Sequence, residues 1–470
     1  MTAAAKAVQS PAGRWILAAS ILGSGAVFLE GSVVSVAVPS IGRDLGLGVA
    51  GLQWVMNGYL LTLSALMLFG GALGDRGSRP RVFGIGLIGF AISSVACGLA
   101  PNVILLIAAR VIQGIFGALV VPNSLALLET TFHAEARGAA IGKWAAWSGV
   151  STALGPLAGG WLVDAASWRF VFFSIVPFAV AAAWIAFRHE SATGKQRHEA
   201  SSLDYTGAIL ATLGLAGVVG ALITGPDAGF TSPIVLATLA GGIVCLAAFL
   251  FVESRAQPPL LPLDVFEHRE FVAANLNTLF VYAALNGLFF LLMLQLQNGL
   301  HYSALIAGAS LLPVNALLLF LSPRSGHLAE RIGPRLPMAL GSLLAAIGML
   351  LFVRVRPGAN YLTTLLPALI VFGIGLGVLV APLTTVALRS LGERRAGIAS
   401  GVNNATARLA GLLATAAIPV AAGLGGSRKP TGPALATAFT RAMIISAALC
   451  GIGALVAATM ISGKKRKSET

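Results

Sequence analysis

Charge is the scarcest feature of this 470-residue sequence, because Asp, Glu, Lys and Arg together make up only 10% of it. Soluble chains carry about 25% charged residues, so a water-facing surface of the usual kind cannot be built from this composition. Hydrophobic residues reach 57%, and the mean hydropathy is +0.87. The composition therefore excludes a set of soluble domains and predicts a membrane protein.

Motifs for other chemistries are also missing. The three cysteines, Cys97, Cys245 and Cys450, lie singly in apolar stretches without CxxC or Cys/His spacing, which argues against a metal site or a disulfide framework. No GxxxxGKS or GxxxxGKT loop is present, so ATP-driven transport is not expected. The apolar stretches contain no paired acids, His/Asp cluster or Ser/Lys pair, so an enzyme is not expected either. We expect no cofactor.

What the sequence has instead is a series of long apolar stretches. Each is long enough to cross about 30 Å of hydrocarbon as a helix, and the 56 glycines suit close packing of such helices. The sequence predicts an all-α polytopic membrane protein with fourteen transmembrane helices. The expected spans are 15–38, 52–71, 82–100, 103–122, 139–162, 170–187, 206–224, 232–252, 271–294, 303–322, 337–353, 361–384, 397–423 and 437–462.

Basic residues are distributed unequally between the two sets of loops. The set that includes both termini carries 22 of the 31 Lys and Arg residues, and two more, Arg110 and Arg408, lie within spans. Because cytoplasmic loops are enriched in Lys and Arg, we expect both termini to be cytoplasmic. This dispersal along loops also explains the net charge of +14 without nucleic-acid binding. The other set of loops holds seven: Arg43, Arg169, Arg354, Arg356, Arg428, Lys429 and Arg441.

An internal repeat divides the chain. Gly71-Ala-Leu-Gly-Asp75-Arg76 follows the second span, and Gly326-His-Leu-Ala-Glu330-Arg331 follows the tenth, 255 residues later. The repeat predicts a six-helix N-terminal half at 1–188 and a six-helix C-terminal half with a basic cytoplasmic tail at 257–470. Between them, residues 189–256 would form an inserted pair of transmembrane helices with cytoplasmic linkers. Two related halves with a site at their interface are typical of transporters.

Four short motifs occupy matching positions in these spans. They are Leu29-Glu30-Gly-Ser-Val-Val-Ser-Val-Ala-Val-Pro39, the loop from Gly71 to Arg81, Arg110-Val-Ile-Gln113-Gly114, and Gly155-Pro156-Leu-Ala-Gly159-Gly160. Together with the repeat they resemble the major facilitator superfamily, and more specifically its fourteen-span drug:proton antiporters. The resemblance implies the major facilitator fold over nearly the whole chain. Three positions depart from the family pattern: Glu30 replaces Asp, Ser78 replaces Gly, and Ser151 replaces Gly.

Glu30 is the only acidic residue deep inside an expected span. Helical rise places it about 13 Å from the outer end of its span, and Arg110 about 10 Å below the outer surface. The resemblance implies that spans one and four meet at a cavity, so we expect Glu30 and Arg110 to form the proton-coupling site. The alternative is a permanent salt bridge that only holds two helices together.

The loop from Gly71 to Arg81, which we call the loop signature, is interpreted as a conformational gate. Asp75 ends span two, where the helix dipole disfavours a carboxylate, so we expect it to contact an arginine or a helix N-terminus in another element. Arg76 and Arg79 accompany it, and Glu330 and Arg331 are its counterparts in the second half. Structural anchoring is the alternative role.

Two further predictions concern residues inside the membrane. Gly155 and Gly159 have the spacing of close helix packing, Pro156 predicts a kink, and the resemblance assigns these residues with Gly160 to the antiporter motif. Arg408 lies about 15 Å deep, where it could bind a substrate carboxylate or backbone carbonyl groups. Glu30, Gln113 and Arg408 are the candidates for lining the substrate cavity.

The sequence thus predicts a secondary active transporter of the cell inner membrane, which exports amphipathic drug-like or antibiotic-like compounds in exchange for protons. Its expected partners are a small amphipathic molecule, protons and the lipid bilayer, without nucleic acid. Whether a periplasmic adaptor protein cooperates with it is left open. The alternatives are a transporter of the same fold for a fatty acid, siderophore or metabolite, and a non-transporting membrane receptor.

Overall fold

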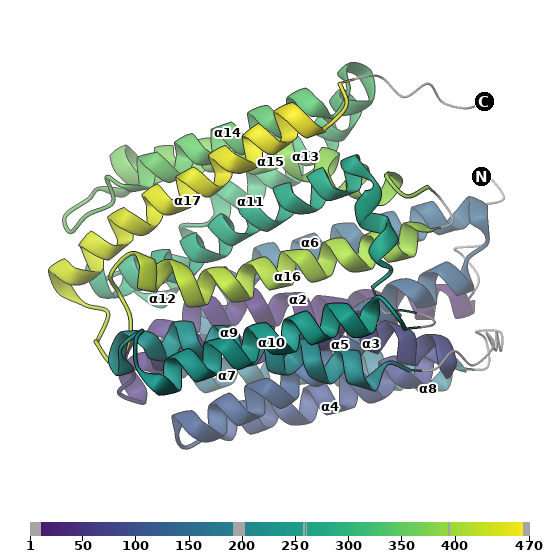
Figure 1. Cartoon of the computed structure of the whole chain (residues 1–470), viewed down its shortest axis with the longest axis horizontal. Helices are drawn as coiled ribbons and strands as arrows, with labels where there is room; N and C mark the ends of the chain where they lie inside the picture. Colours follow the sequence, from purple (N-terminus) through teal and green to yellow (C-terminus); the bar gives the residue numbers. More distant parts are fainter. Residues whose placement is uncertain (1–10, 191–202, 257–258, 260, 393–394, 464–470) are drawn as a thin grey trace. The chain divides into compact units, whose positions relative to one another are not determined.

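The computed structural model describes residues 11–190, 203–256, 259, 261–392 and 395–463. Every regular element within these ranges is a helix (Figure 1). Some basic residues used in the topology argument, such as Lys195, Arg197, Arg394 and the tail from Lys464 to Lys467, lie outside the described residues.

The helices follow each other with short connections. The first half of the chain contains α2 (Pro11–Asp44), α3 (Val49–Arg76), α4 (Arg79–Leu99), α5 (Val103–Thr131), α6 (Ala134–Ala165), α7 (Trp168–Phe173), α8 (Val176–Arg188), α9 (Tyr205–Ala228) and α10 (Pro233–Glu253). The second half contains the 3₁₀-helix η2 (Leu263–Glu267), α11 (Arg269–Leu294), the π-helix η3 (Gln295–Gly299), α12 (Ala304–Ala309), α13 (Leu312–Ile332), α14 (Arg335–Phe352), the π-helix η4 (Tyr361–Leu365), α15 (Leu366–Arg389), α16 (Ala396–Ala421) and α17 (Gly432–Met460).

Twelve helices of the described chain are long and apolar enough to cross a membrane. The two remaining expected spans, 139–162 and 397–423, fall on α6 and α16, which have 32 and 26 residues. Both helices have a lower hydropathy because they carry polar residues within the span, among them Lys143 in α6 and Arg408 in α16. The structure therefore establishes an all-helical membrane fold, and the count of fourteen spans stays a prediction.

Turn chemistry explains where several helices begin and end. Asn102 follows Pro101 and caps α5, since its side chain accepts a hydrogen bond from the Leu105 N–H at 3.0 Å. Ser78 caps α4 in the same way, with Pro80 in the first turn of the helix. Gly333 ends α13 at a φ of +90°, which a residue with a side chain rarely adopts.

The described helices group into two compact units. Unit 1 comprises Met1–Leu47, Trp54–Val218 and Ala237–Leu261, and unit 2 comprises Gly48–Gln53, Val219–Leu236 and Pro262–Thr470. In unit 1, α2 packs against α5, α6 and α8, and α4 packs against α5 and α8. In unit 2, α14 packs against α15 and α17, while α11 packs against α16 and α17.

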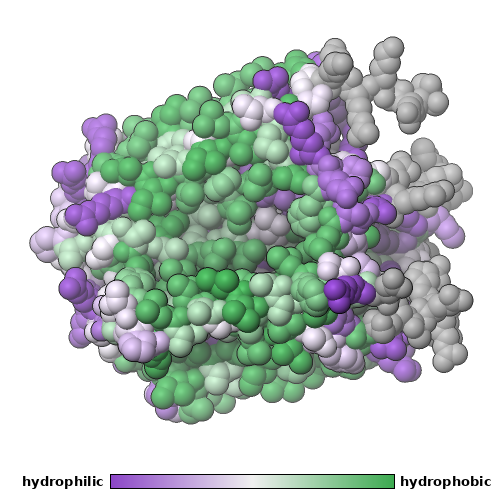
Figure 2. Space-filling model, viewed as in Figure 1, coloured by the Kyte–Doolittle hydropathy of each residue, from purple (hydrophilic) through white to green (hydrophobic). Residues whose placement is uncertain are grey.

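Apolar side chains cover the outer faces of the helices. Figure 2 shows them over the middle of the visible helices, with hydrophilic side chains gathered toward the helix ends. Helix α10 is an extreme case, because only 11% of its most apolar window is buried, and it exposes large side chains such as Ile234, Val244 and Phe251. Such surfaces suit contact with lipid acyl chains rather than with water.

Candidate transport site

The centre of unit 1 holds a buried ion pair between α2 and α5. The Arg110 guanidinium donates through Nη1 to the Glu30 carboxylate, and neither side chain has any solvent exposure. The structure therefore brings together the two residues predicted to form the proton-coupling site. A charged pair in this environment is stable only while both partners stay together, because each charge alone would be desolvated without compensation.

Arg110 is held by more than its carboxylate partner. Its Nε donates to the Val55 carbonyl of α3 at 3.0 Å, and its Nη1 also donates to Gln113 Oε1 at 2.7 Å. The guanidinium carbon lies 4.4 Å from the centre of the Tyr59 ring and 5.8 Å from that of Phe172. These contacts come from α3, α5 and α7, so the cation has attractive neighbours that do not depend on the charge of Glu30.

Gln113 extends the site toward α4. Its amide nitrogen donates to Ser94 Oγ at 2.7 Å, and its oxygen also accepts from Cys97 Sγ at 3.7 Å. Gln113 has no solvent exposure. Both ends of its amide are thus occupied within unit 1, and in this structure Gln113 orders Arg110 instead of facing an open cavity.

Helix α6 packs closely on α2 just beyond Glu30. A Cβ atom placed on Gly159 would lie 2.9 Å from the Val33 carbonyl oxygen, and one on Gly155 would collide with Ser32. Small residues at these positions let the two helix backbones approach each other. The antiporter motif therefore contacts the helix that carries the buried carboxylate, within one turn of it.

The departure from the family pattern within α6, Ser151 in place of glycine, has a structural reason. Ser151 bonds to the Trp147 carbonyl of its own helix at 3.0 Å, and its hydroxyl faces Gly25 of α2. The small residue at Gly25 makes the room that the extra Ser151 side chain needs. Helix α6 continues through Pro156, and Gly160 is buried beside it.

Asp75 pairs with Arg79 across the break between α3 and α4. The Arg79 Nη2 lies 2.7 Å from Asp75 Oδ1, and Arg79 Nη1 donates to the Ala126 carbonyl of α5 at 3.0 Å. The expected arginine partner in another helix is thus present. All these residues belong to unit 1, so this ion pair alone does not join the two halves. Arg76 is exposed at the end of α3.

The Ser78 hydroxyl makes hydrogen bonds that the glycine usual at this position of the loop signature cannot make. Its hydroxyl accepts from the Arg81 N–H and donates to Glu190 Oε1 at 2.8 Å, while Arg81 pairs with the same carboxylate at 2.6 Å. The loop is therefore tied to the residue that follows α8. In unit 2 the counterpart Glu330 lies beside His327 of its own helix at 3.6 Å, and Arg331 makes no ion pair with another described residue.

The interior of unit 2 contains amides where unit 1 has charges. Asn403 of α16 donates to Thr278 of α11 at 2.8 Å and to Asn275 at 3.3 Å. Asn277 of α11 donates to Ser342 of α14 at 3.1 Å and to the Gly453 carbonyl of α17 at 2.7 Å. Four helices are thus joined by neutral hydrogen bonds within the membrane-spanning part of the unit.

Arg408 lies on α16 in unit 2 and is partly buried. It lies near Tyr282 of α11. A Cβ atom on Gly411 would lie 3.0 Å from the Asn286 side chain of α11, which shows how closely the two helices approach.

Several residues of the site were not identified from the sequence. Tyr59, Ser94 and Phe172 contact Arg110 or Gln113 directly, and the Asn277 and Asn403 contacts organise unit 2. Polar side chains in the middle of apolar spans were the available signal for Ser94 and the asparagines, because they need partners there. Nothing in the sequence distinguishes Tyr59 or Phe172 from other aromatics. Among the residues described, no cluster of His, Cys, Asp and Glu could hold a metal ion.

Comparison with known proteins agrees with this architecture. Residues 20–415 match the Major Facilitator Superfamily. The chain is 37% identical over 410 residues to the puromycin resistance protein pur8 of Streptomyces alboniger, covering 85% of this chain and 79% of that protein. It is 34% identical over 405 residues to the tetracenomycin C resistance and export protein of Streptomyces glaucescens, covering 86% and 75%.

Solved structures show the same fold at low sequence identity. The bacterial homologue of the human lysosomal transporter Spinster, in an inward-facing and unoccupied conformation, matches with a TM-score of 0.67 at 17% identity, covering 98% of this chain and 100% of that one. The family match and the identities above decide the classification. The chain belongs to the Major Facilitator Superfamily and is a multi-pass membrane transporter, not an enzyme.

Proposed function

We propose that this protein exports amphipathic drug-like or antibiotic-like compounds across the cell inner membrane in exchange for protons. The observation that carries the proposal is the ion pair of Glu30 and Arg110, fully buried between α2 and α5. Relatives named for puromycin resistance and for tetracenomycin C resistance and export support the direction and the substrate class.

The coupling step follows from the charge of the pair. Proton uptake by Glu30 removes its negative charge and with it the ionic attraction between Glu30 and Arg110. Arg110 then remains held by the Val55 carbonyl, Gln113 and the Tyr59 ring. Loss of the proton restores the pair. Because neither charge is exposed in this structure, proton exchange requires α2 or α5 to move.

Helix α6 would limit the movement of α2. Gly155 and Gly159 hold α6 against Ser32 and Val33, one turn beyond Glu30. A shift of α2 on proton binding would slide along this contact, and a tight contact would limit ion leakage at the same time. We propose this role for the antiporter motif, with Pro156 and Gly160. The Asp75–Arg79 pair, with Arg76, Glu330 and Arg331, would steady the loops that move with the halves.

We further propose fourteen spans, with α6 and α16 as the two additional ones and both termini in the cytoplasm. In this arrangement residues 1–188 and 257–470 form the two halves, and residues 189–256 form the inserted pair. Glu30 and Gln113 in unit 1 and Arg408 in unit 2 are the residues that would contact the substrate. Arg408 suits an acidic or polar group of the substrate, since a cation within a span needs a partner that compensates its charge.

Dye efflux from everted membrane vesicles tests the proposal. Energised vesicles containing the protein should accumulate a fluorescent dye or puromycin, and a protonophore should abolish the accumulation while an ATPase inhibitor leaves it unchanged. The matched control is Glu30→Gln, which should express normally and accumulate nothing above background. Accumulation that persists after the proton gradient is collapsed would overturn proton antiport. Wild-type protein that transports no drug-like compound in a broad panel would overturn the export of drugs.

A further inference from the structure

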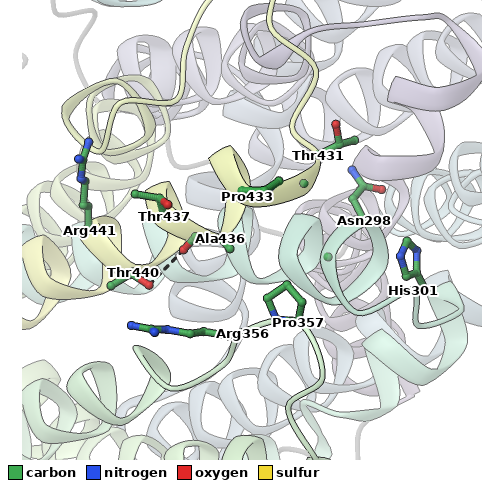
Figure 3. Close-up of a pocket in the computed structure, with 12 residues that line it drawn as sticks. Asn298, His301, Arg356, Pro357, Thr431, Pro433, Ala436, Thr437, Thr440 and Arg441 are labelled. Atoms are coloured by element: carbon green, nitrogen blue, oxygen red, sulfur yellow. Dashed lines mark hydrogen bonds between the residues drawn. The ribbon is translucent and has the colours of Figure 1, made fainter.

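A cavity of about 810 Å³ lies at the end of unit 2 opposite the C-terminal end of α17. Three segments of unit 2 line it: the residues around η3, the loop between α14 and α15, and the first turns of α17 (Figure 3). None of the residues considered above as coupling or gating groups lines it. The function of this cavity must therefore be inferred from the residues that line it.

The lining of this cavity is cationic. Arg356 and Arg441 both belong to it, as does His301, and no carboxylate is among the lining residues. Among the residues described, neither arginine makes an ion pair. In Figure 3 the two arginine side chains flank Thr437 and Thr440 of α17, and His301 lies toward the other end of the cavity.

Two further features favour an anion here. The cavity includes Thr431 and Gly432 at the N-terminus of α17, a helix of 29 residues whose dipole places partial positive charge at this end. In addition, five of the seven Lys and Arg residues in the loops expected outside the cytoplasm belong to unit 2. The positive-inside rule disfavours basic residues on that side, so two arginines in the lining of one cavity need a reason of their own.

An exposed apolar surface continues from the cavity along the membrane-spanning part of α17. Arg441 is followed at helical spacing by Ile444, Ile452 and Leu455, which are 51%, 41% and 65% exposed. Helix α14, packed against α17, exposes an apolar face of its own that ends just before the Arg356 loop. Its exposed residues there are Leu343, Ile347 and Leu350.

We propose that this cavity binds the headgroup of an anionic phospholipid in the outer leaflet of the membrane. The phosphodiester would lie between Arg356 and Arg441, whose planar guanidinium groups match phosphate oxygens. The acyl chains would follow the exposed faces of α17 and α14. A free phosphate would use the two arginines but would leave this apolar surface and most of the cavity unused, so the lipid is the better fit.

Native mass spectrometry of the purified full-length protein tests the site without any transport step. The protein is incubated with equal amounts of phosphatidylglycerol and phosphatidylethanolamine bearing the same acyl chains, and retained lipid is counted. We expect phosphatidylglycerol to be retained preferentially. Arg356→Gln and Arg441→Gln should each lower its retention about fivefold, the effect of one basic residue near an anionic headgroup, and the double variant should remove the preference.

Matched variants separate this effect from a general loss of charge or of folding. Arg354→Gln removes an exposed arginine of the same loop that does not line the cavity, and it should leave the preference unchanged. Arg356→Lys and Arg441→Lys keep the charge but lose the planar guanidinium group, so each should retain more of the preference than the corresponding Gln variant, with unfolding temperatures equal to that of the wild type. An unchanged preference in the double variant, or an equal loss in Arg354→Gln, would overturn the proposal. So would displacement of phosphatidylglycerol by millimolar inorganic phosphate, which would show a soluble anion as the ligand.

Discussion

The two units differ in what their interiors are made of. In unit 1, Glu30 and Arg110 form a fully buried ion pair, and Gln113 is bound to it. In unit 2, Asn277 and Asn403 lead a set of neutral hydrogen bonds. An ion pair disappears when its carboxylate is protonated, whereas an amide keeps its hydrogen bonds at every physiological pH. Among these contacts, the Glu30–Arg110 pair is the one that protonation of a carboxylate would break.

The two copies of the loop repeat, at Asp75 in unit 1 and at Glu330 in unit 2, also differ in how their charges are paired. Asp75 of unit 1 pairs with Arg79 across a helix break, while Glu330 of unit 2 lies beside His327 within one helix. Charges in unit 1 thus join separate helices, both in the interior and in the loop. In unit 2, amides and hydroxyls join α11 to α14, α16 and α17, and Arg269 of α11 also donates to the Thr459 carbonyl of α17 at 2.7 Å. Under the proposed function, proton binding would therefore act on Glu30 in unit 1 and would leave the Asn277 and Asn403 contacts of unit 2 unchanged.

The largest effect on stability is expected from removing Arg110. Arg110→Gln leaves Glu30 buried without its arginine, and breaking a buried pair in this way costs about 3–5 kcal/mol. Glu30→Gln in the same protein should restore most of the loss, which a double-mutant cycle on thermal or denaturant unfolding measures. The control is Arg169→Gln, which breaks the partly exposed Arg169–Asp44 pair and should cost at most about 1 kcal/mol. Equal losses for the two arginines would contradict the special status of the buried pair.

A smaller effect is expected at the contact between α6 and α2. Gly159→Ala places a Cβ atom 2.9 Å from the Val33 carbonyl oxygen, and overpacking of this kind costs about 1–3 kcal/mol. Transport should fall together with the stability of the protein, because α2 also carries Glu30. Gly149→Ala is the matched change, since a Cβ atom there meets nothing within 4 Å. It should leave stability and transport intact, and a similar loss from both variants would show that the effect is not one of packing.

The amide contacts of unit 2 should matter less and without pH dependence. Asn277→Ala removes the hydrogen bonds to Ser342 and to the Gly453 carbonyl and should cost about 1–2 kcal/mol. The Asn286 side chain donates to the Tyr282 carbonyl of its own helix at 2.8 Å, so Asn286→Ala serves as the control. Unfolding measured at several pH values should show the same Asn277→Ala loss throughout. A loss that varies with pH would remove the distinction between the two units.

The smallest change in stability is expected at Asp75. It is half-exposed and its pair with Arg79 is screened by water, so Asp75→Asn should cost no more than about 1 kcal/mol. Transport should nevertheless fall sharply if the loop takes part in the movement of the halves. Comparison of expression, unfolding temperature and efflux for Asp75→Asn and Arg76→Gln measures this. Normal efflux by a well-expressed Asp75→Asn protein would remove the gating role.

Long apolar stretches and motif positions were sufficient to predict the helical membrane fold and the family. They were also sufficient to place Glu30 and Arg110 at similar depth, because helical rise converts sequence position into depth. The environment of the pair could not be predicted. Whether Gln113 faces a cavity or binds Arg110 depends on the rotation of α5, and nothing in the motif fixes that rotation.

The partners of Asp75 and Arg408 show a second limit of the sequence. The dipole argument predicted an arginine for Asp75, but several arginines follow it in the loop, and only the turn between α3 and α4 selects Arg79. For Arg408 the sequence left two partners open, and Tyr282 was not one of them. Contacts between helices distant in sequence depend on packing, which periodicity does not specify.

Coupled flux in proteoliposomes tests the central claim most directly. Purified wild-type protein, Glu30→Asp and Glu30→Gln are reconstituted at equal density, and substrate movement against its gradient is recorded together with the internal pH. We predict that the wild type moves substrate uphill when a proton gradient is imposed and that Glu30→Asp retains part of this activity. Glu30→Gln should remain folded and show no uphill movement and no proton flux. Uphill transport by Glu30→Gln with the pH dependence of the wild type would contradict the account.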